Sequence, residues 1–176
     1  MKVVNAGRNS RWYAGSGIFR HVWLIKTNKL YLDKWDTFVN ASELQKKEAV
    51  IQFSTIVHNE GLQNQSGKIG IKIYSPAGNE VFSTSQDVIL SEGTPVATSF
   101  SLKKPELWSV DTPVLYTAEV SLSSDGKEYD KISVPFGIRT LSFSAEKGFL
   151  LNGKSMKLKG GCVHHDNGLL GAAAID

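Results

Sequence analysis

Alternation of apolar and polar residues dominates the middle of the chain and predicts β-strands. Residues 68–74 read Lys-Ile-Gly-Ile-Lys-Ile-Tyr, which places three isoleucines on one face of an extended strand and two lysines on the other. Successive side chains of a strand point to opposite faces, so this pattern is that of a half-buried strand. The same period of two recurs in four further inward-facing sets: Ile51, Phe53, Thr55 and Val57; Val96, Thr98, Phe100 and Leu102; Tyr116, Ala118, Val120 and Leu122; Ile132, Val134 and Phe136.

Turn residues separate the alternating stretches. Asp125-Gly126 and Asn152-Gly153 each lie between two apolar runs. Both residues of such a pair tolerate positive φ, which favours a tight hairpin. About seven short strands at regular spacing within residues 30–138 therefore predict an all-β fold, an immunoglobulin-like β-sandwich of about seven strands with flanking partial segments.

Four regions have a less clear pattern. Residues 30–39 and 80–90 look extended, with weaker alternation. Helical signal is confined to residues 42–49, which could form one or two turns, and to residues 171–176, which could begin a helix.

The two flanks do not fit the sandwich. Residues 11–20 are rich in glycine and aromatic side chains and lead into one apolar strand at residues 21–26. A lone strand cannot satisfy its own backbone hydrogen bonds, so this one requires a partner sheet. We therefore expect three segments: 1–26 as the tail of one module, 27–140 as the sandwich domain, and 141–176 as the start of another module.

Composition excludes several classes of protein. The 176 residues carry 20 basic and 17 acidic side chains, for a net charge of +3, and this near-balance argues against electrostatically driven nucleic-acid binding. The apolar runs are only a few residues long, so no membrane-spanning helix is expected. Cys162 is the single cysteine, which excludes an intrachain disulfide and a zinc site made mainly of cysteines.

Four short motifs stand out along the chain: Ser16-Gly17-Ile18-Phe19-Arg20-His21-Val22-Trp23-Leu24, Trp108 to Tyr116, Phe136-Gly137-Ile138-Arg139, and Leu151-Asn152-Gly153-Lys154 followed by Leu158-Lys159-Gly160. In their order and spacing they resemble the motifs of glycoside hydrolase family 2, which contains β-galactosidases, β-glucuronidases and β-mannosidases. Within the family, the sequence of residues 159–166 resembles bacterial β-galactosidase-like members more than mannosidases.

The resemblance implies a domain organisation. Residues 1–26 would close an N-terminal sugar-binding jelly roll, residues 27–140 would form the central immunoglobulin-like domain, and residues 141–176 would open a (β/α)₈ catalytic barrel. The parent enzyme would be a retaining hydrolase of β-galactosides or related β-glycosides. Its two catalytic glutamates would lie beyond these residues, so this chain would contain no catalytic residue and be inactive by itself.

The resemblance also singles out one site residue. His164 falls on the histidine of the first barrel strand and would bind substrate in the parent enzyme. Read without the family, Cys162, His164 and His165 could suggest a transition-metal site. Neighbouring histidines on a strand point to opposite faces, however, so we expect no metal site and no cofactor.

The remaining expectations concern partners and aromatic residues. The expected partners are the β-glycoside substrate, through the parent enzyme, and the neighbouring jelly-roll and barrel domains, with no nucleic acid and no membrane. Tyr116 should be a structural residue whose hydroxyl bonds nearby backbone, as in a tyrosine corner. The scattered aromatic rings should pack at module junctions rather than form a sugar-binding platform: Trp12, Tyr13, Trp23, Trp35 and Trp108.

The alternative to a domain of a glycoside hydrolase is a stand-alone carbohydrate-binding or adhesion sandwich. A stand-alone enzyme is disfavoured because no nucleophile–base pair is visible.

Overall fold

The computed structural model describes residues 2, 4, 21–45, 47–61 and 63–162. By internal contacts the chain divides into two compact units, Met1–Lys26 with Leu158–Asp176 and Thr27–Lys157; the second contains the sheets and is called the compact unit below. Among the described residues, no helix is long and apolar enough to cross a membrane.

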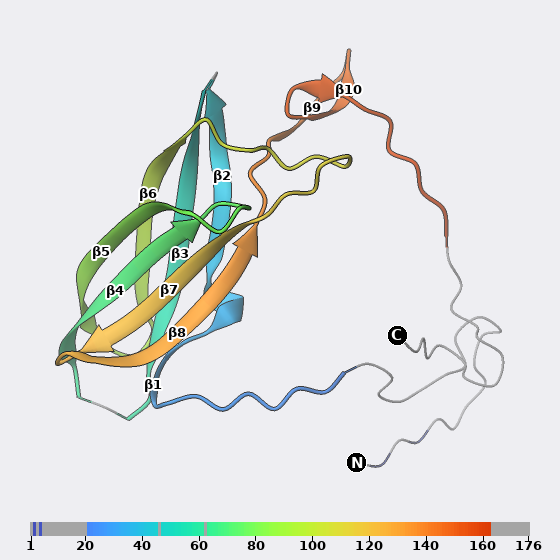
Figure 1. The fold of residues 1–176 in the computed structure, drawn as a ribbon. Coiled ribbons are helices and arrows are strands. Elements are labelled where there is room, and N and C mark those ends of the chain that lie inside the picture. The colour runs from blue at the N-terminus through green and yellow to red at the C-terminus, as the bar shows by residue number, and fades with distance from the viewer. Residues whose placement is uncertain (1, 3, 5–20, 46, 62, 163–176) are drawn as a thin grey trace. The chain divides into compact units, whose positions relative to one another are not determined.

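The compact unit is built on two antiparallel sheets (Figure 1). In the first, β3 (Glu48–Asn59) pairs with β6 (Thr94–Lys103) along one edge and with β2 (Phe38–Gln45) and then β1 (Leu30–Leu32) along the other. The second sheet has the order β5 (Glu80–Leu90), β4 (Gln65–Tyr74), β7 (Tyr116–Ser124), β8 (Lys127–Phe136). Because β1 and β2 share one edge of β3, these eight strands correspond to about seven positions, and the predicted all-β sandwich is confirmed.

The core lies between the two sheets and follows the alternation of the sequence. Ile69, Ile71 and Ile73 of β4 are at most 1% exposed, and alternate residues of the neighbouring strand β7 and of β3 in the other sheet are buried as well. The rings of Phe82 and Phe100 stack with centroids 4.0 Å apart, so that a side chain of β5 contacts one of β6. The buried polar residue Thr55 bonds the hydroxyl of Thr37 at 2.7 Å, which satisfies it within the apolar interior.

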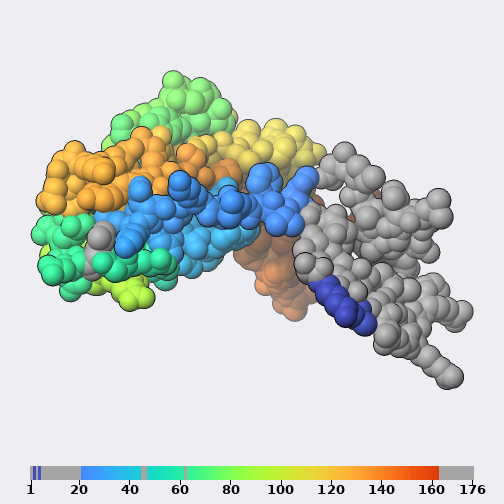
Figure 2. Space-filling view, turned by 90° about the horizontal axis from the view of Figure 1, so that it is seen from below, coloured from blue at the N-terminus to red at the C-terminus, as the bar shows by residue number. Residues whose placement is uncertain are grey.

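β1 joins the first sheet to the second. It pairs with β3, and the backbone N–H of Leu32 donates to the carboxylate of Asp130 on β8 at 2.8 Å. Figure 2 shows the blue atoms of this region against the orange atoms of β8 on the face in view. A 3₁₀ turn, η1 (Lys34–Asp36), follows β1 and leads into β2.

A small third sheet follows the sandwich. It contains β9 (Leu141–Ser144), β10 (Gly148–Leu151) and β11 (Lys154–Ser155), in the order β11-β10-β9. The predicted hairpin turns are confirmed: Asp125-Gly126 joins β7 to β8 and Asn152-Gly153 joins β10 to β11, all four residues with positive φ. Residues 141–157, which sequence reasoning assigns to the start of a barrel, thus share one compact unit with the sandwich.

Two local expectations are wrong. Residues 42–49 are not helical, because they belong to the hairpin of β2 and β3, and tertiary pairing with β3 overrides their local helical signal. Residues 21–26 form no strand, and their side chains are exposed. A strand needs a neighbouring strand for its hydrogen bonds, and among the described strands none pairs with this segment. The possible helix start at residues 171–176 lies outside the described residues.

Candidate functional site

The substrate-binding residue expected from the sequence, His164, lies outside the described residues, as do His165, Asp166 and Arg11. Cys162, which is described, has an exposed free thiol. The site therefore has to be sought among the surfaces of the compact unit.

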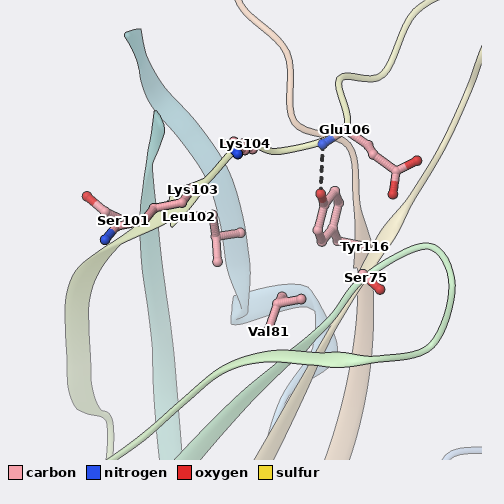
Figure 3. Close-up of a pocket in the computed structure, with 8 residues that line it drawn as sticks. All are labelled: Ser75, Val81, Ser101, Leu102, Lys103, Lys104, Glu106 and Tyr116. Atoms are coloured by element: carbon pink, nitrogen blue, oxygen red, sulfur yellow. Dashed lines mark hydrogen bonds between the residues drawn. The ribbon is translucent and has the colours of Figure 1, made fainter. Parts of the chain in front are cut away.

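Tyr116, the first residue of β7, fixes the loop that precedes it. Its hydroxyl accepts a hydrogen bond of 2.9 Å from the backbone N–H of Glu106, and the residue is only 4% exposed (Figure 3). Burial raises the pKa of the Tyr116 hydroxyl above its usual value, and the N–H of Glu106 partly opposes this shift. The protonated hydroxyl thus ties β7 to the loop, as expected for a tyrosine corner.

A pocket of about 460 Å³ lies beside this tyrosine (Figure 3). It is lined by the ring of Tyr116, by Val81 and Leu102, and by the polar residues Ser75, Ser101, Lys103, Lys104 and Glu106. A second pocket, of about 400 Å³, lies between the loop at residues 107–112 and the hairpin at residues 151–156.

Neither pocket has the chemistry of glycoside hydrolysis. That reaction needs two carboxyl groups that flank the scissile bond, about 5 Å apart for retention of configuration. Glu106 is the one carboxylate that lines the first pocket, and Asp111 is the one that lines the second. The residues that line each pocket therefore lack the second carboxylate.

Trp108 lies where the sandwich meets the β10–β11 hairpin. Its backbone N–H donates to the carbonyl of Ile138 at 2.9 Å, and the guanidinium of Arg139 lies over its ring at 4.8 Å from the centroid. Gly137 makes the close packing possible, because a Cβ at this position would come within 3.0 Å of the Cβ and Cγ of Trp108.

Asn152 then connects the hairpin to this tryptophan. Its side-chain amide donates to the carbonyl of Trp108 at 3.0 Å, and its side-chain oxygen accepts from the backbone N–H of Thr140, also at 3.0 Å. Residues of three of the motifs singled out by sequence, at 108–116, 136–139 and 151–154, thus meet at one junction. Sequence order alone could not show that they are neighbours in space.

Asp33, Asp36 and His58 form the one cluster of potential metal ligands found among the described residues. One ligand atom from each lies within 4.8 Å of the others, and all three side chains are partly buried. Nε2 of His58 lies 2.9 Å from Oδ2 of Asp36. Oδ1 of Asp33 accepts a hydrogen bond from the backbone N–H of Trp35 and so caps η1.

Sequence reasoning missed this cluster. His58 is separated from the two aspartates by the whole of β2, and only the pairing of β3 with β1 brings them together. The available signal was two aspartates three positions apart in a predicted strand, which is too common to indicate a site.

The aromatic residues named from the sequence differ in their exposure. Trp23 and Trp35 are 80% and 79% exposed, whereas Trp108 is half-buried at the hairpin junction. Trp12 and Tyr13 lie outside the described residues.

The comparisons with known proteins agree with this architecture. The model of the family "Glycosyl hydrolases family 2" matches residues 30–139. The chain is 39% identical over 176 residues to the β-galactosidase BoGH2A of Bacteroides ovatus, across 98% of this chain and 21% of that protein. It is 29% identical over 163 residues to a β-glucuronidase of Bacteroides fragilis, across 89% of this chain and 24% of that one.

A solved structure gives the same result. A glycosyl hydrolase family 2 member from Bacteroides cellulosilyticus superposes with a TM-score of 0.88 at 42% identity, across 97% of this chain and 22% of the other. The chain thus spans about a fifth of the length of these relatives. Because the family model matches most of the chain, the chain belongs to glycosyl hydrolase family 2.

Proposed function

We propose that this chain is a non-catalytic structural domain of a retaining glycoside hydrolase that cleaves β-galactosides or related β-glycosides. Its task is to hold a jelly-roll domain and a catalytic barrel of the same protein in a fixed arrangement. Residues 1–26 and 141–176 would belong to those two neighbours, and residues 27–140 would form the rigid domain between them.

The main support for the proposal is the difference between the share of this chain that aligns with its relatives and the share of each relative that it covers. Almost the whole chain aligns with each relative, yet it accounts for only 21–24% of the two enzymes compared by sequence. The relatives are a β-galactosidase and a β-glucuronidase, so the shared reaction class is hydrolysis of a β-glycoside, and the sugar is the part that differs between them.

The geometry supports a structural role. The two pockets each lack the facing carboxylates of a glycosidase, whereas the junction of Trp108, Gly137 and Asn152 is closely packed and tied by hydrogen bonds. A packed junction of this kind transmits the position of the sandwich to the chain that follows it. In the parent enzyme, His164 would then contact the substrate from the first strand of the barrel.

Activity assays test the proposal directly. This chain, purified alone, should not hydrolyse aryl β-galactosides or aryl β-glucuronides. The longer protein that contains it should hydrolyse one of them with retention, which proton NMR of the first-formed sugar anomer reports. Replacing His164 by Ala in that longer protein should lower kcat/KM. Turnover by the short chain that survives repurification would overturn the non-catalytic role.

A further inference from the structure

We propose that Asp33, Asp36 and His58 form a binding site for one divalent transition-metal cation, which ties η1 to β3. The site is separate from the hydrolytic reaction of the parent enzyme and does not depend on the function proposed above.

The three ligand atoms are already close to the spacing that a metal requires. Metal bonds to imidazole nitrogen and carboxylate oxygen are about 2.0–2.2 Å long, so two ligand atoms of one ion lie at most about 4.4 Å apart. The atoms here lie within 4.8 Å of one another. A small rotation of one aspartate side chain about its own bonds is enough to bring all three onto one ion.

The ligand set selects the class of cation. One imidazole and two carboxylates suit Zn²⁺, Co²⁺, Ni²⁺ or Mn²⁺, with water in the remaining positions. Ca²⁺ takes six to eight oxygen ligands and Mg²⁺ keeps most of its water, so both should bind this set weakly. All three residues are partly buried rather than enclosed, which leaves room for those waters.

The fold holds His58 in place for this role. Its ring stacks on that of Tyr31 with centroids 4.9 Å apart and planes at 14°. The hydroxyl of Tyr31 in turn donates to Oε1 of Glu60 at 3.0 Å. An imidazole fixed by such outer contacts loses little freedom on binding a metal, and outer contacts of this kind commonly tune metal affinity.

The surroundings also favour a cation. Asp33 and Asp36 place two carboxylates within 4.8 Å of the imidazole of His58. The carboxylate of Glu60 bonds Tyr31, whose ring stacks on that of His58. A bound cation would neutralise part of this negative charge and replace the contact between His58 and Asp36.

Isothermal titration calorimetry with ZnCl₂ and with CoCl₂ tests the site. Cys162, His164 and His165 offer competing ligands, so the background should be the variant C162S/H164Q/H165Q. In that background we expect one cation per chain and a melting temperature that rises with the cation concentration. His58→Gln, Asp36→Asn and Asp33→Asn should each weaken binding about tenfold or more. Asparagine is a good N-cap, so Asp33→Asn should keep η1 folded.

Two controls make the result decisive. Asp87→Asn, which removes an exposed carboxylate of the other sheet, should leave the affinity unchanged. In the same C162S/H164Q/H165Q background, with Asp33, Asp36 and His58 intact, Co²⁺ should shift or broaden the NMR resonances of the His58 and Tyr31 rings. This measurement needs no substitution at the site itself. Absence of saturable binding, equal affinity in His58→Gln, or Co²⁺ effects elsewhere on the chain would each overturn the proposal.

Discussion

The side-chain amide of Asn152 donates a hydrogen bond of 3.0 Å to the backbone carbonyl of Trp108, 44 positions earlier in the chain. Asn152 also has a φ of +51°, the left-handed conformation that asparagine tolerates better than most residues. One residue therefore makes the turn of the β10–β11 hairpin and attaches that hairpin to the sandwich. The hairpin is positioned by this contact, since β9, β10 and β11 pair only with one another among the described strands.

Replacing Asn152 should loosen the hairpin selectively. Asn152→Gly keeps the backbone conformation and loses both side-chain hydrogen bonds, which should cost about 1–3 kcal/mol in the free energy of unfolding. Asn152→Ala should cost about 1–2 kcal/mol more, because alanine is strained at positive φ. Chemical denaturation measures both values.

Hydrogen exchange locates the effect of the same variants. Amides of β9 and β10 should exchange faster in Asn152→Gly, while those of β4 and β7 keep their protection, because the core of the sandwich is untouched. Equal loss of protection in the core strands would show that the hairpin and the sandwich unfold as one unit.

Gly137→Ala should disturb Trp108 directly. The new methyl group would come within 3.0–3.1 Å of three atoms of the tryptophan side chain, closer than ordinary contact, and overpacking of this kind costs about 1–3 kcal/mol. The melting temperature should fall, and the fluorescence of Trp108 should change. Gly160→Ala is the matched control, because no atom lies within 4 Å of the added methyl group. A Gly137→Ala variant as stable as the control would mean that Trp108 can move aside at no cost.

The sandwich could be predicted from sequence because burial repeats with a period of two. Ile71 and Lys72 show this most clearly: the first is 1% exposed and faces the other sheet, while the second lies outside and pairs with Glu80 at 3.2 Å. The tight turns were equally accessible, since Asp-Gly and Asn-Gly pairs identify their own backbone conformation.

The sites could not be predicted in the same way. The link from Asn152 to Trp108 and the cluster of His58 with Asp33 and Asp36 depend on which strands become neighbours, and no local pattern encodes that. The hairpin at residues 38–59 was missed for the same reason, because its pairing outweighs the weak helical signal of residues 42–49.

Ile71→Asp should unfold the domain, whereas Lys72→Gln should be nearly neutral. Aspartate at position 71 would place a carboxylate between the sheets without a partner, with an expected cost above about 4 kcal/mol. Lys72→Gln removes only an exposed ion pair, and pairs of this kind contribute little to stability. Circular dichroism during thermal unfolding separates the two, and similar melting temperatures would show that the assignment of faces is wrong.

Tyr116→Phe should weaken the domain and also change its response to alkali. Loss of the hydrogen bond from the Glu106 N–H should cost about 0.5–1.5 kcal/mol at neutral pH. Burial raises the pKa of the Tyr116 hydroxyl in the folded state above the ordinary value of 10.0. The folded state therefore retains this proton at a pH where the unfolded state releases it. The stabilising contribution is complete below about pH 10 and is lost as the pH rises through the folded-state pKa.

The free energies of unfolding of the unmutated chain and of Tyr116→Phe should therefore differ least at high pH. Tyr31 and Lys72 also have raised pKa values, so both proteins should lose stability in alkali. The loss should be steeper in the chain that keeps Tyr116, because only that chain has the buried hydroxyl to ionise. Urea unfolding at several pH values from 7 to 11 measures the two slopes, with phenolate absorbance as a direct titration of the hydroxyl. Parallel slopes would show that Tyr116 ionises equally easily in the folded and unfolded states, contrary to its burial beneath the loop of Glu106.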